Sequence, residues 1–150
     1  MNSSTFTCFF YGTLMDNIVL KRVIGRYHKG IQKRQGILND FKRVKVKEAH
    51  YPAIVVSKGD TVEGLVVYGI ANDALLLLDG FEDDEYRRKY VTVLLRDDQK
   101  TKAATYVAGP NMFLDDEGWC FSTWQQKHRK EFLKNLGIWN RIEKGQRDAI

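Results

Sequence analysis

Two short runs of the sequence hold residue types that could take part in chemistry. The first, FFYGTLM at residues 9–15, is an aromatic, strand-like run that stops at a glycine followed by a threonine. A glycine allows the backbone to approach a ligand closely, and N–H groups at a helix start bind carboxylates or developing oxyanions. Most turns of this composition only connect two elements. The candidate substrate-binding residues in this turn are Tyr11, Gly12, Thr13, Leu14 and Met15.

The second run is FEDDEYRR at residues 81–88, where four carboxylates follow a short apolar segment. Consecutive side chains cannot all point the same way, so one or two of them at most face inward. Glu82, beside Phe81 at the exit of a helix, would lose solvent there, which raises its pKa and makes it a stronger base. The alternative is an exposed acidic loop that balances a basic strand, and the residues alone favour that interpretation.

The hydrophobic periodicity around these runs predicts about six strands and three helices. The expected strands cover residues 5–10, 41–47, 52–56, 62–70, 90–96 and 103–108, with SKGD at 57–60 as the turn between the third and the fourth. The expected helix caps are Asp16, Asn72 or Asp73, and Ser122 or Thr123, and the expected stops of the first two helices are Gly25 and Gly80. Strands outnumber helices without strict alternation, so the pattern indicates an α+β fold, with a mixed sheet or small barrel and helices packed outside.

Length and composition favour a single domain over residues 1–150, because 150 residues that are 43% hydrophobic suit one compact core. The basic segment 136–150 either frays or docks through its apolar side chains. The N-terminus lacks a signal-like pattern and no apolar run approaches the length of a membrane span. We therefore expect a cytoplasmic protein with no membrane partner.

The cysteines and histidines show no spacing that indicates a metal site or a catalytic triad. Cys8 is expected to be a small buried residue within a strand rather than a catalytic thiol. His28, His50 and His128 are far apart in the sequence. The residues therefore give no sign of a metal or a cofactor.

The positive charge is concentrated in one segment. The formal net charge is +5, and ten Lys and Arg residues but only one acid, Asp40, lie between Lys21 and Lys47. The simpler interpretation is a solvated face, and the alternative is a surface that binds an anionic polymer. The chain shows no recognised nucleic-acid motif, so a nucleic-acid partner is not expected.

In combination, these runs resemble the gamma-glutamylcyclotransferase-like superfamily, and within it the avirulence-induced-gene-like branch. The resemblance covers roughly residues 6–136. It rests on FFYGTLM, YPAIV, VEGLVVYGI, LDGFEDDEYRRKYVTV, and TYVAG followed by GWCFSTWQQKHRKEFL. The first and fourth pieces are the specific ones, and their order and separation match the family pattern.

The resemblance implies a small mixed β-barrel with flanking helices and a pocket between the YGTL turn and a glutamate. By position, the family's catalytic carboxylate falls on Glu82, and Tyr86 matches an aromatic residue that commonly follows it. The family reaction cyclises a γ-glutamyl group to 5-oxoproline and releases an amine, without a metal or a cofactor. The implied substrate is a small γ-glutamyl amine or amino acid, with Glu82 as general base.

One position departs from the family pattern. Many members with cyclotransferase activity have glycine directly after the catalytic glutamate, where this chain has Asp83. A second carboxylate beside Glu82 would raise its pKa and could disfavour an anionic substrate. This departure leaves a second hypothesis open, in which the same fold binds a small molecule or a protein without turnover.

Overall fold

The computed structural model describes residues 5–137, and the chain separates into two compact units, Met1–Trp119 and Cys120–Ile150. The strands of the first unit are β1 (Thr5–Phe10), β2 (Gln32–Lys45), β3 (Pro52–Ala71), β4 (Tyr86–Leu95) and β5 (Lys100–Ala108). Its helices are α1 (Asn17–Ile24) and α2 (Asn72–Glu82), with three short 3-10 turns, Thr13–Met15, Gly25–His28 and Asp83–Glu85. The second unit contains α3 (Phe121–Lys127) and a further helical segment at 129–137.

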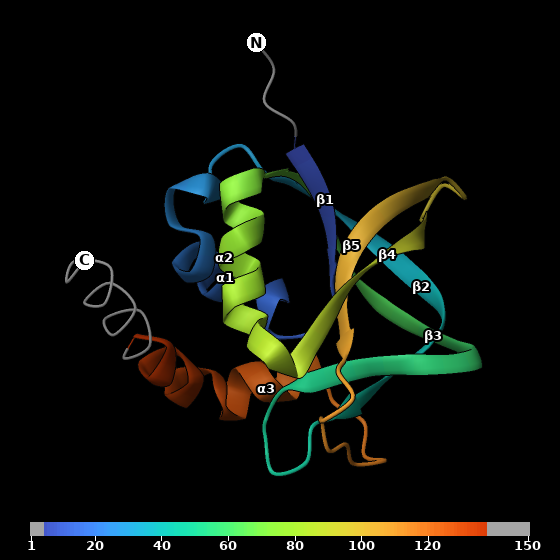
Figure 1. The fold of residues 1–150 in the computed structure, drawn as a ribbon, viewed down its shortest axis with the longest axis vertical. Helices are drawn as coiled ribbons and strands as arrows, with labels where there is room; N and C mark the ends of the chain where they lie inside the picture. The colour runs from blue at the N-terminus through green and yellow to red at the C-terminus, as the bar shows by residue number, and fades with distance from the viewer. Residues whose placement is uncertain (1–4, 138–150) are drawn as a thin grey trace. The chain divides into compact units, whose positions relative to one another are not determined.

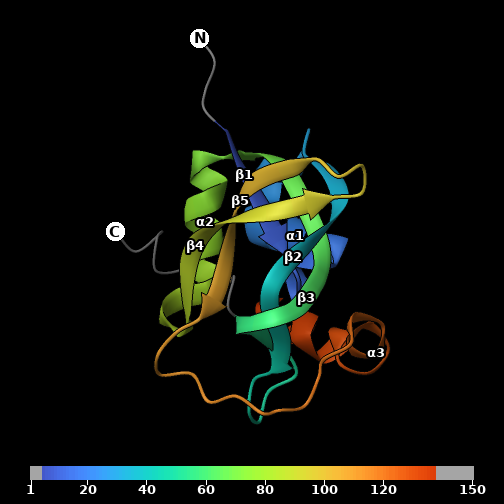
Figure 2. The same cartoon turned by 90° about the vertical axis from the view of Figure 1, so that its right-hand side faces the viewer.

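The five strands of the first unit close into a barrel in the order β1-β3-β2-β4-β5. All neighbouring pairs are antiparallel except β1 and β5, which pair in parallel at Cys8 and Ala104 and so close the barrel. Figure 2 shows these strands around a common interior, and in Figure 1 α1 and α2 lie together beside β1. The fold is therefore α+β, as the sequence predicts.

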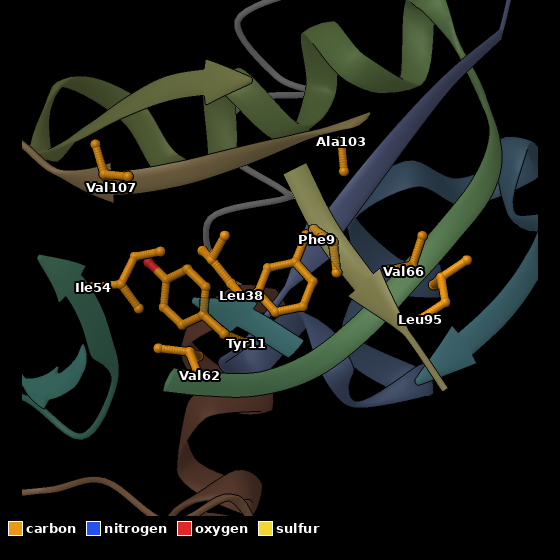
Figure 3. Close-up of a cluster of buried hydrophobic side chains, with 10 residues drawn as sticks. Phe9, Tyr11, Leu38, Ile54, Val62, Val66, Leu95, Ala103 and Val107 are labelled. Atoms are coloured by element: carbon orange, nitrogen blue, oxygen red, sulfur yellow. The ribbon is translucent and has the colours of Figure 1, made fainter. Parts of the chain in front are cut away.

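The interior of the barrel is apolar because alternate side chains of each strand point inward. Ten buried residues form this core: Phe9, Tyr11, Leu38, Ile54, Val62, Val66, Val93, Leu95, Ala103 and Val107 (Figure 3). In Figure 3 the ring of Tyr11 lies among Ile54, Leu38 and Val62. The first residue of the YGTL turn is thus part of the core, which fixes where that turn leaves β1.

The predicted turn at 57–60 is wrong, and the number of strands is five rather than about six. Residues 52–71 form one strand, because both halves of β3 pair with the same partner, β2. The register changes from Asn39 opposite Thr61 to Phe41 opposite Val56, so residues 57–60 bulge out opposite Asp40. Gly59 does have the positive φ that is typical of a turn, +88°, but it lies in a bulge within β3 instead of ending the strand.

Both predicted ends of the first helix are confirmed. The Asp16 carboxylate accepts hydrogen bonds from the amides of Ile18 and Val19 at 3.0 and 3.1 Å, and the helix ends at Gly25 with φ of +57°. The predicted stop at Gly80 is wrong. The second helix runs on to Glu82 and ends at Asp83, whose φ is +55°. The helix therefore carries Glu82 as its last residue.

In the second unit, α3 begins after Cys120 rather than at the predicted Ser122 or Thr123 cap. The rings of Trp124 in α3 and Phe132 in the following helical segment meet edge to face with centroids 5.4 Å apart, although α3 itself ends at Lys127. The predicted tail falls largely on residues 138–150, outside the described residues, and the single-domain assignment stays a prediction. None of the helices between residues 5 and 137 is long and apolar enough to cross a membrane.

Candidate active site

Among the side chains of the acidic run that the structure describes, the carboxyl of Glu82 is the buried one. Burial raises the pKa of its carboxyl from an ordinary 4.5 to about 8, and the nearby charge of Glu85 acts in the same direction. The carbonyls at the C-terminal end of α2 also disfavour a negative charge at its last residue. The residue as a whole is only half-buried, so its carboxylate is desolvated while part of the side chain still meets solvent.

No hydrogen bond to the Glu82 carboxylate is recorded within residues 5–137. Asp83 and Glu85, its neighbours in the same run, are exposed. The interpretation of the run as a wholly exposed acidic loop is therefore wrong for Glu82. A raised pKa without a protein partner is the state expected of a group that exchanges protons with a ligand.

Four tyrosines lie within electrostatic reach of Glu82. Burial is the largest cause that raises the pKa of these four tyrosines, and the charge of Glu82 raises the same pKa values by a smaller amount. These residues are Tyr11, Tyr51, Tyr86 and Tyr106. These tyrosines come from the YGTL turn, the segment before β3, the start of β4 and the middle of β5. Glu82 is thus within electrostatic reach of the first residue of the turn.

The hydroxyls of these tyrosines are bound to fixed acceptors rather than to Glu82. Tyr11 donates to the carbonyl oxygen of Tyr106 at 2.5 Å, and Tyr86 donates to the carbonyl oxygen of Pro52 at 2.8 Å. Tyr51, which is half-buried, donates to Oε2 of Glu85 at 3.3 Å. The wall around Glu82 is therefore held in place by hydrogen bonds before any ligand arrives.

The YGTL turn is buried and held closely against β3. A Cβ atom on Gly12 would lie 2.8 Å from Cγ of Pro52, so only glycine fits without a shift. Thr13 and Leu14 are buried and open the 3-10 turn, whose first amides have no acceptor within the turn itself. Met15 is half-buried, and its amide donates to the carbonyl of Gly12 at 3.0 Å.

Arg43 fixes the orientation of the turn. Its Nη1 donates to the carbonyl oxygen of Tyr11 at 2.7 Å, and its guanidinium lies 5.8 Å from the ring centroid of Trp119. Because the carbonyl of Tyr11 and the N–H of Gly12 belong to one trans peptide, binding the first aims the second in the opposite direction. The position of these amides opposite Glu82 stays a prediction.

Sequence reasoning overlooked three residues of this region, namely Arg43, Asp79 and Tyr106. Arg43 was counted only as an outward residue of a basic strand, and Asp79 only as one acid among several. Their roles depend on pairings between strands far apart in the sequence. The one available signal was position, since Asp79 lies on the same helix face as Glu82, three residues before it.

Cys8 is buried within β1, as predicted. Burial raises the pKa of its thiol to about 12, and the charges of Arg88 and Asp79 act on it more weakly, in opposite directions. A thiol with such a pKa carries almost no thiolate near neutral pH, so Cys8 does not provide a nucleophile.

The family model described as gamma-glutamyl cyclotransferase, AIG2-like, matches residues 8–129. The chain belongs to this family. AIG2-like protein D from Arabidopsis thaliana is 42% identical over 129 residues, which cover 84% of this chain and 83% of that protein. AIG2-like protein C from the same plant is 32% identical over 135 residues, covering 87% and 75%. The resemblance seen in the sequence is thereby confirmed.

Solved structures of other proteins share the fold. The solution structure of an Arabidopsis thaliana protein has a TM-score of 0.65 and 29% identity and covers 96% of both chains. A structure titled gamma-glutamyl cyclotransferase has a TM-score of 0.62 over 74% of this chain and 70% of that chain. Its identity is 19%, so it supports the fold alone.

Proposed function

We propose that this chain is a γ-glutamylcyclotransferase that converts a small γ-glutamyl amine or amino acid to 5-oxoproline and a free amine, with Glu82 as general base. The observation that carries the proposal is the desolvated Glu82 carboxyl, whose pKa is raised to about 8, into the range of an α-amine at about 8. Proton transfer between groups whose pKa values lie close together costs little free energy, which suits a general base.

The reaction requires only proton transfers from the protein. The substrate's α-amine is mostly protonated near neutral pH, and the ionised fraction of Glu82, which grows as the pH rises through its pKa of about 8, removes one of the amine's protons. The amine nitrogen then forms a bond to the γ-carbonyl carbon of the same molecule, which closes a five-membered ring without a protein nucleophile. The bond from that carbon to the leaving nitrogen breaks as Glu82 returns the proton to it, and the ring nitrogen releases its second proton to solvent, from which the free amine is protonated. No water is consumed.

The YGTL turn is proposed to bind the anionic part of the substrate. Backbone N–H groups of Gly12, Thr13 and Leu14 would hold the α-carboxylate or the oxyanion that develops on the γ-carbonyl oxygen. Met15 and the ring of Tyr86 would bound the same space. The rigidity that Arg43 and Pro52 give the turn supports this role, because donors fixed in advance need no reorganisation during the reaction.

The proposal is tested by incubating the purified full chain with γ-glutamyl amines and γ-glutamyl amino acids and measuring 5-oxoproline by chromatography. In water enriched in oxygen-18, we expect unlabelled 5-oxoproline and an equal amount of free amine. Labelled glutamate would show hydrolysis and contradict the mechanism. Thermal stabilisation by a γ-glutamyl compound with no product from any substrate would contradict the enzyme and favour a binding module.

A further inference from the structure

Asp79 joins the helix that carries Glu82 to two strands of the barrel. Its Oδ2 accepts a hydrogen bond from Nη1 of Arg88 on β4 at 2.7 Å, and its Oδ1 accepts one from the hydroxyl of Tyr106 on β5 at 2.7 Å. Both carboxylate oxygens are therefore engaged by partners on different strands. Asp79 lies one helical turn before Glu82, so these two bonds restrain the last turn of α2.

Tyr106 carries this restraint across to the YGTL turn. Its hydroxyl binds Asp79, while its backbone carbonyl accepts the hydroxyl of Tyr11 at 2.5 Å. Tyr106 is 4% exposed as a residue, while the side chain of its partner Asp79 is 35% exposed, so the hydrogen bond between them is partly buried. One residue of β5 thus bonds directly to the helix of Glu82 on one side and to the first residue of the turn on the other.

The segment after Glu82 is tied down as well. Tyr86, four residues later, donates to the carbonyl of Pro52, and Pro52 is the residue that contacts Gly12. Glu82 itself has no such bond among the described residues. It therefore lies between two anchored positions, Asp79 and Tyr86, and its place in the site is set by its neighbours along the chain.

We propose that Asp79, held by Arg88 and Tyr106, is the positioning residue that keeps the Glu82 carboxylate in its desolvated place opposite the YGTL turn. The expected effect on kcat rests on the proposed function. The expected effect on the position and titration of Glu82 does not. Asp79 acts through Glu82 and the last turn of α2. If its bonds are lost, that turn gains freedom and the carboxylate moves toward water.

Two variants remove one partner of Asp79 each. Tyr106→Phe deletes only the hydroxyl and changes no charge. Arg88→Gln removes a positive charge, which by direct electrostatics would raise the pKa of Glu82, whereas displacement of Glu82 into water would lower it. In Arg88→Gln, loss of the charge alone would thus raise the pKa of Glu82, and displacement of Glu82 would lower it. Tyr90→Phe is the matched control, because Tyr90 is 59% exposed on β4.

The readout is the titration of the Glu82 carboxyl, followed by carbon-13 NMR of the full chain labelled at glutamate and assigned with Glu82→Gln. Besides burial, the charge that acts on this titration is that of Glu85. The tyrosines on which Glu82 acts have pKa values raised above their ordinary value, so they stay neutral throughout it. We expect the midpoint to fall from about 8 toward 4.5 in Tyr106→Phe and in Arg88→Gln. Tyr90→Phe should keep the wild-type midpoint.

Kinetics on the best γ-glutamyl substrate provide the second readout. We expect kcat to fall about 10- to 100-fold in Tyr106→Phe with little change in KM, because the base is misplaced while the binding surface is retained. A midpoint that is unchanged in Tyr106→Phe or raised in Arg88→Gln overturns the inference. If wild type releases no 5-oxoproline, the proposed function fails, and the titration still decides the role of Asp79.

Discussion

The turn at residues 11–15 and the acidic segment at residues 82–86 form two contrasting parts of the site. The turn has no charged side chain, is largely buried, and is fixed by Arg43 on one side and Pro52 on the other. The acidic segment has exposed charges, a non-glycine residue at positive φ, and a glutamate whose pKa is strongly raised. One part is built like a core and the other like a loop.

This contrast matches the two tasks that the proposed reaction sets. Binding an anion requires donors that do not move, so a turn packed into the barrel suits it. Moving a proton requires a group that is unstable in its charged form, so burial of a carboxylate suits that task. The fold therefore holds the turn at residues 11–15 in place, whereas in the acidic segment it destabilises the charged form of Glu82.

The largest effect is expected on turnover in Glu82→Gln. The amide keeps the shape of the side chain but cannot accept the amine proton, so kcat should fall by about 10²- to 10⁴-fold. Rates of 5-oxoproline release under saturating substrate measure this. Asp83→Asn serves as the control, since Asp83 is exposed and its charge is not among those that shift Glu82. Equal losses in both variants would remove Glu82 from the mechanism.

The same substitution should stabilise the fold at alkaline pH. Between pH 4.5 and about 8 the folded chain holds a proton on Glu82 that the unfolded chain releases, so the native pKa lowers stability as pH rises through this window. The full difference in pKa would correspond to about 5 kcal/mol, and residual solvent access reduces it. In urea titrations, the free energy of unfolding of Glu82→Gln should exceed that of wild type by about 2–3 kcal/mol at pH 9 and should be almost the same near pH 4.

Gly12→Ala should damage the rigid side of the site. The added Cβ would meet Cγ of Pro52 at 2.8 Å, and the resulting shift should cost about 1–3 kcal/mol of unfolding free energy. Gly80→Ala is the matched control, because nothing lies within 4 Å of its added Cβ and the residue is in α2. That variant should gain up to about 1 kcal/mol. Denaturant titrations that rank the two variants the other way would contradict the packing assigned to the turn.

The sequence predicts the parts of the molecule that depend on local chemistry. Asp16 caps α1 and Gly25 ends it because both act on amides and backbone angles within a few residues. Such features need no knowledge of distant strands. Glu82 is different, because the residues alone favour an exposed acidic loop there and it is the resemblance to the family that implies its role.

Features that depend on distant pairing were beyond the sequence. The turn signal at 57–60 was overridden because both flanking segments find the same partner in β2. Residues 32–39 lie outside the predicted strands, yet they form the first part of β2 because their backbone pairs with β3. Arg43 and Asp79 gained their roles in the same way, from neighbours that the barrel brings to them.

Asp83→Gly should relieve strain in the acidic segment. Asp83 has φ of +55° and ψ of −151°, a region that only glycine occupies at low cost. Glycine there should raise the free energy of unfolding by about 1 kcal/mol. Asp83→Ala keeps the Cβ and removes the charge, so thermal unfolding should show no comparable gain. If alanine stabilises as much as glycine, charge rather than backbone strain explains the position.

This geometry also revises what the departure at Asp83 means. The carboxylate that raises the pKa of Glu82 is that of Glu85, after burial, and not that of the adjacent Asp83. The backbone angles of Asp83 in this chain are ones that glycine adopts at low cost. The presence of Asp83 is compatible with a working base at Glu82.

The smallest effect is expected from Glu85→Gln. Removing this charge lowers the pKa of Glu82, so the acid limb of kcat/KM should move to lower pH, by less than one pH unit, since burial is the larger cause. A pH profile of 5-oxoproline formation between pH 5 and 10 measures the shift. An acid limb that moves to higher pH would show that Glu85 acts on Glu82 by some means other than charge.

The central claim is that the fold raises the pKa of Glu82 to the range of a substrate amine. Carbon-13 NMR of glutamate-labelled wild-type chain, with Glu82→Gln to assign the signal, measures that pKa without any substrate. The account predicts a titration midpoint of about 8 for this carboxyl. A midpoint near the ordinary value of 4.5 would contradict it.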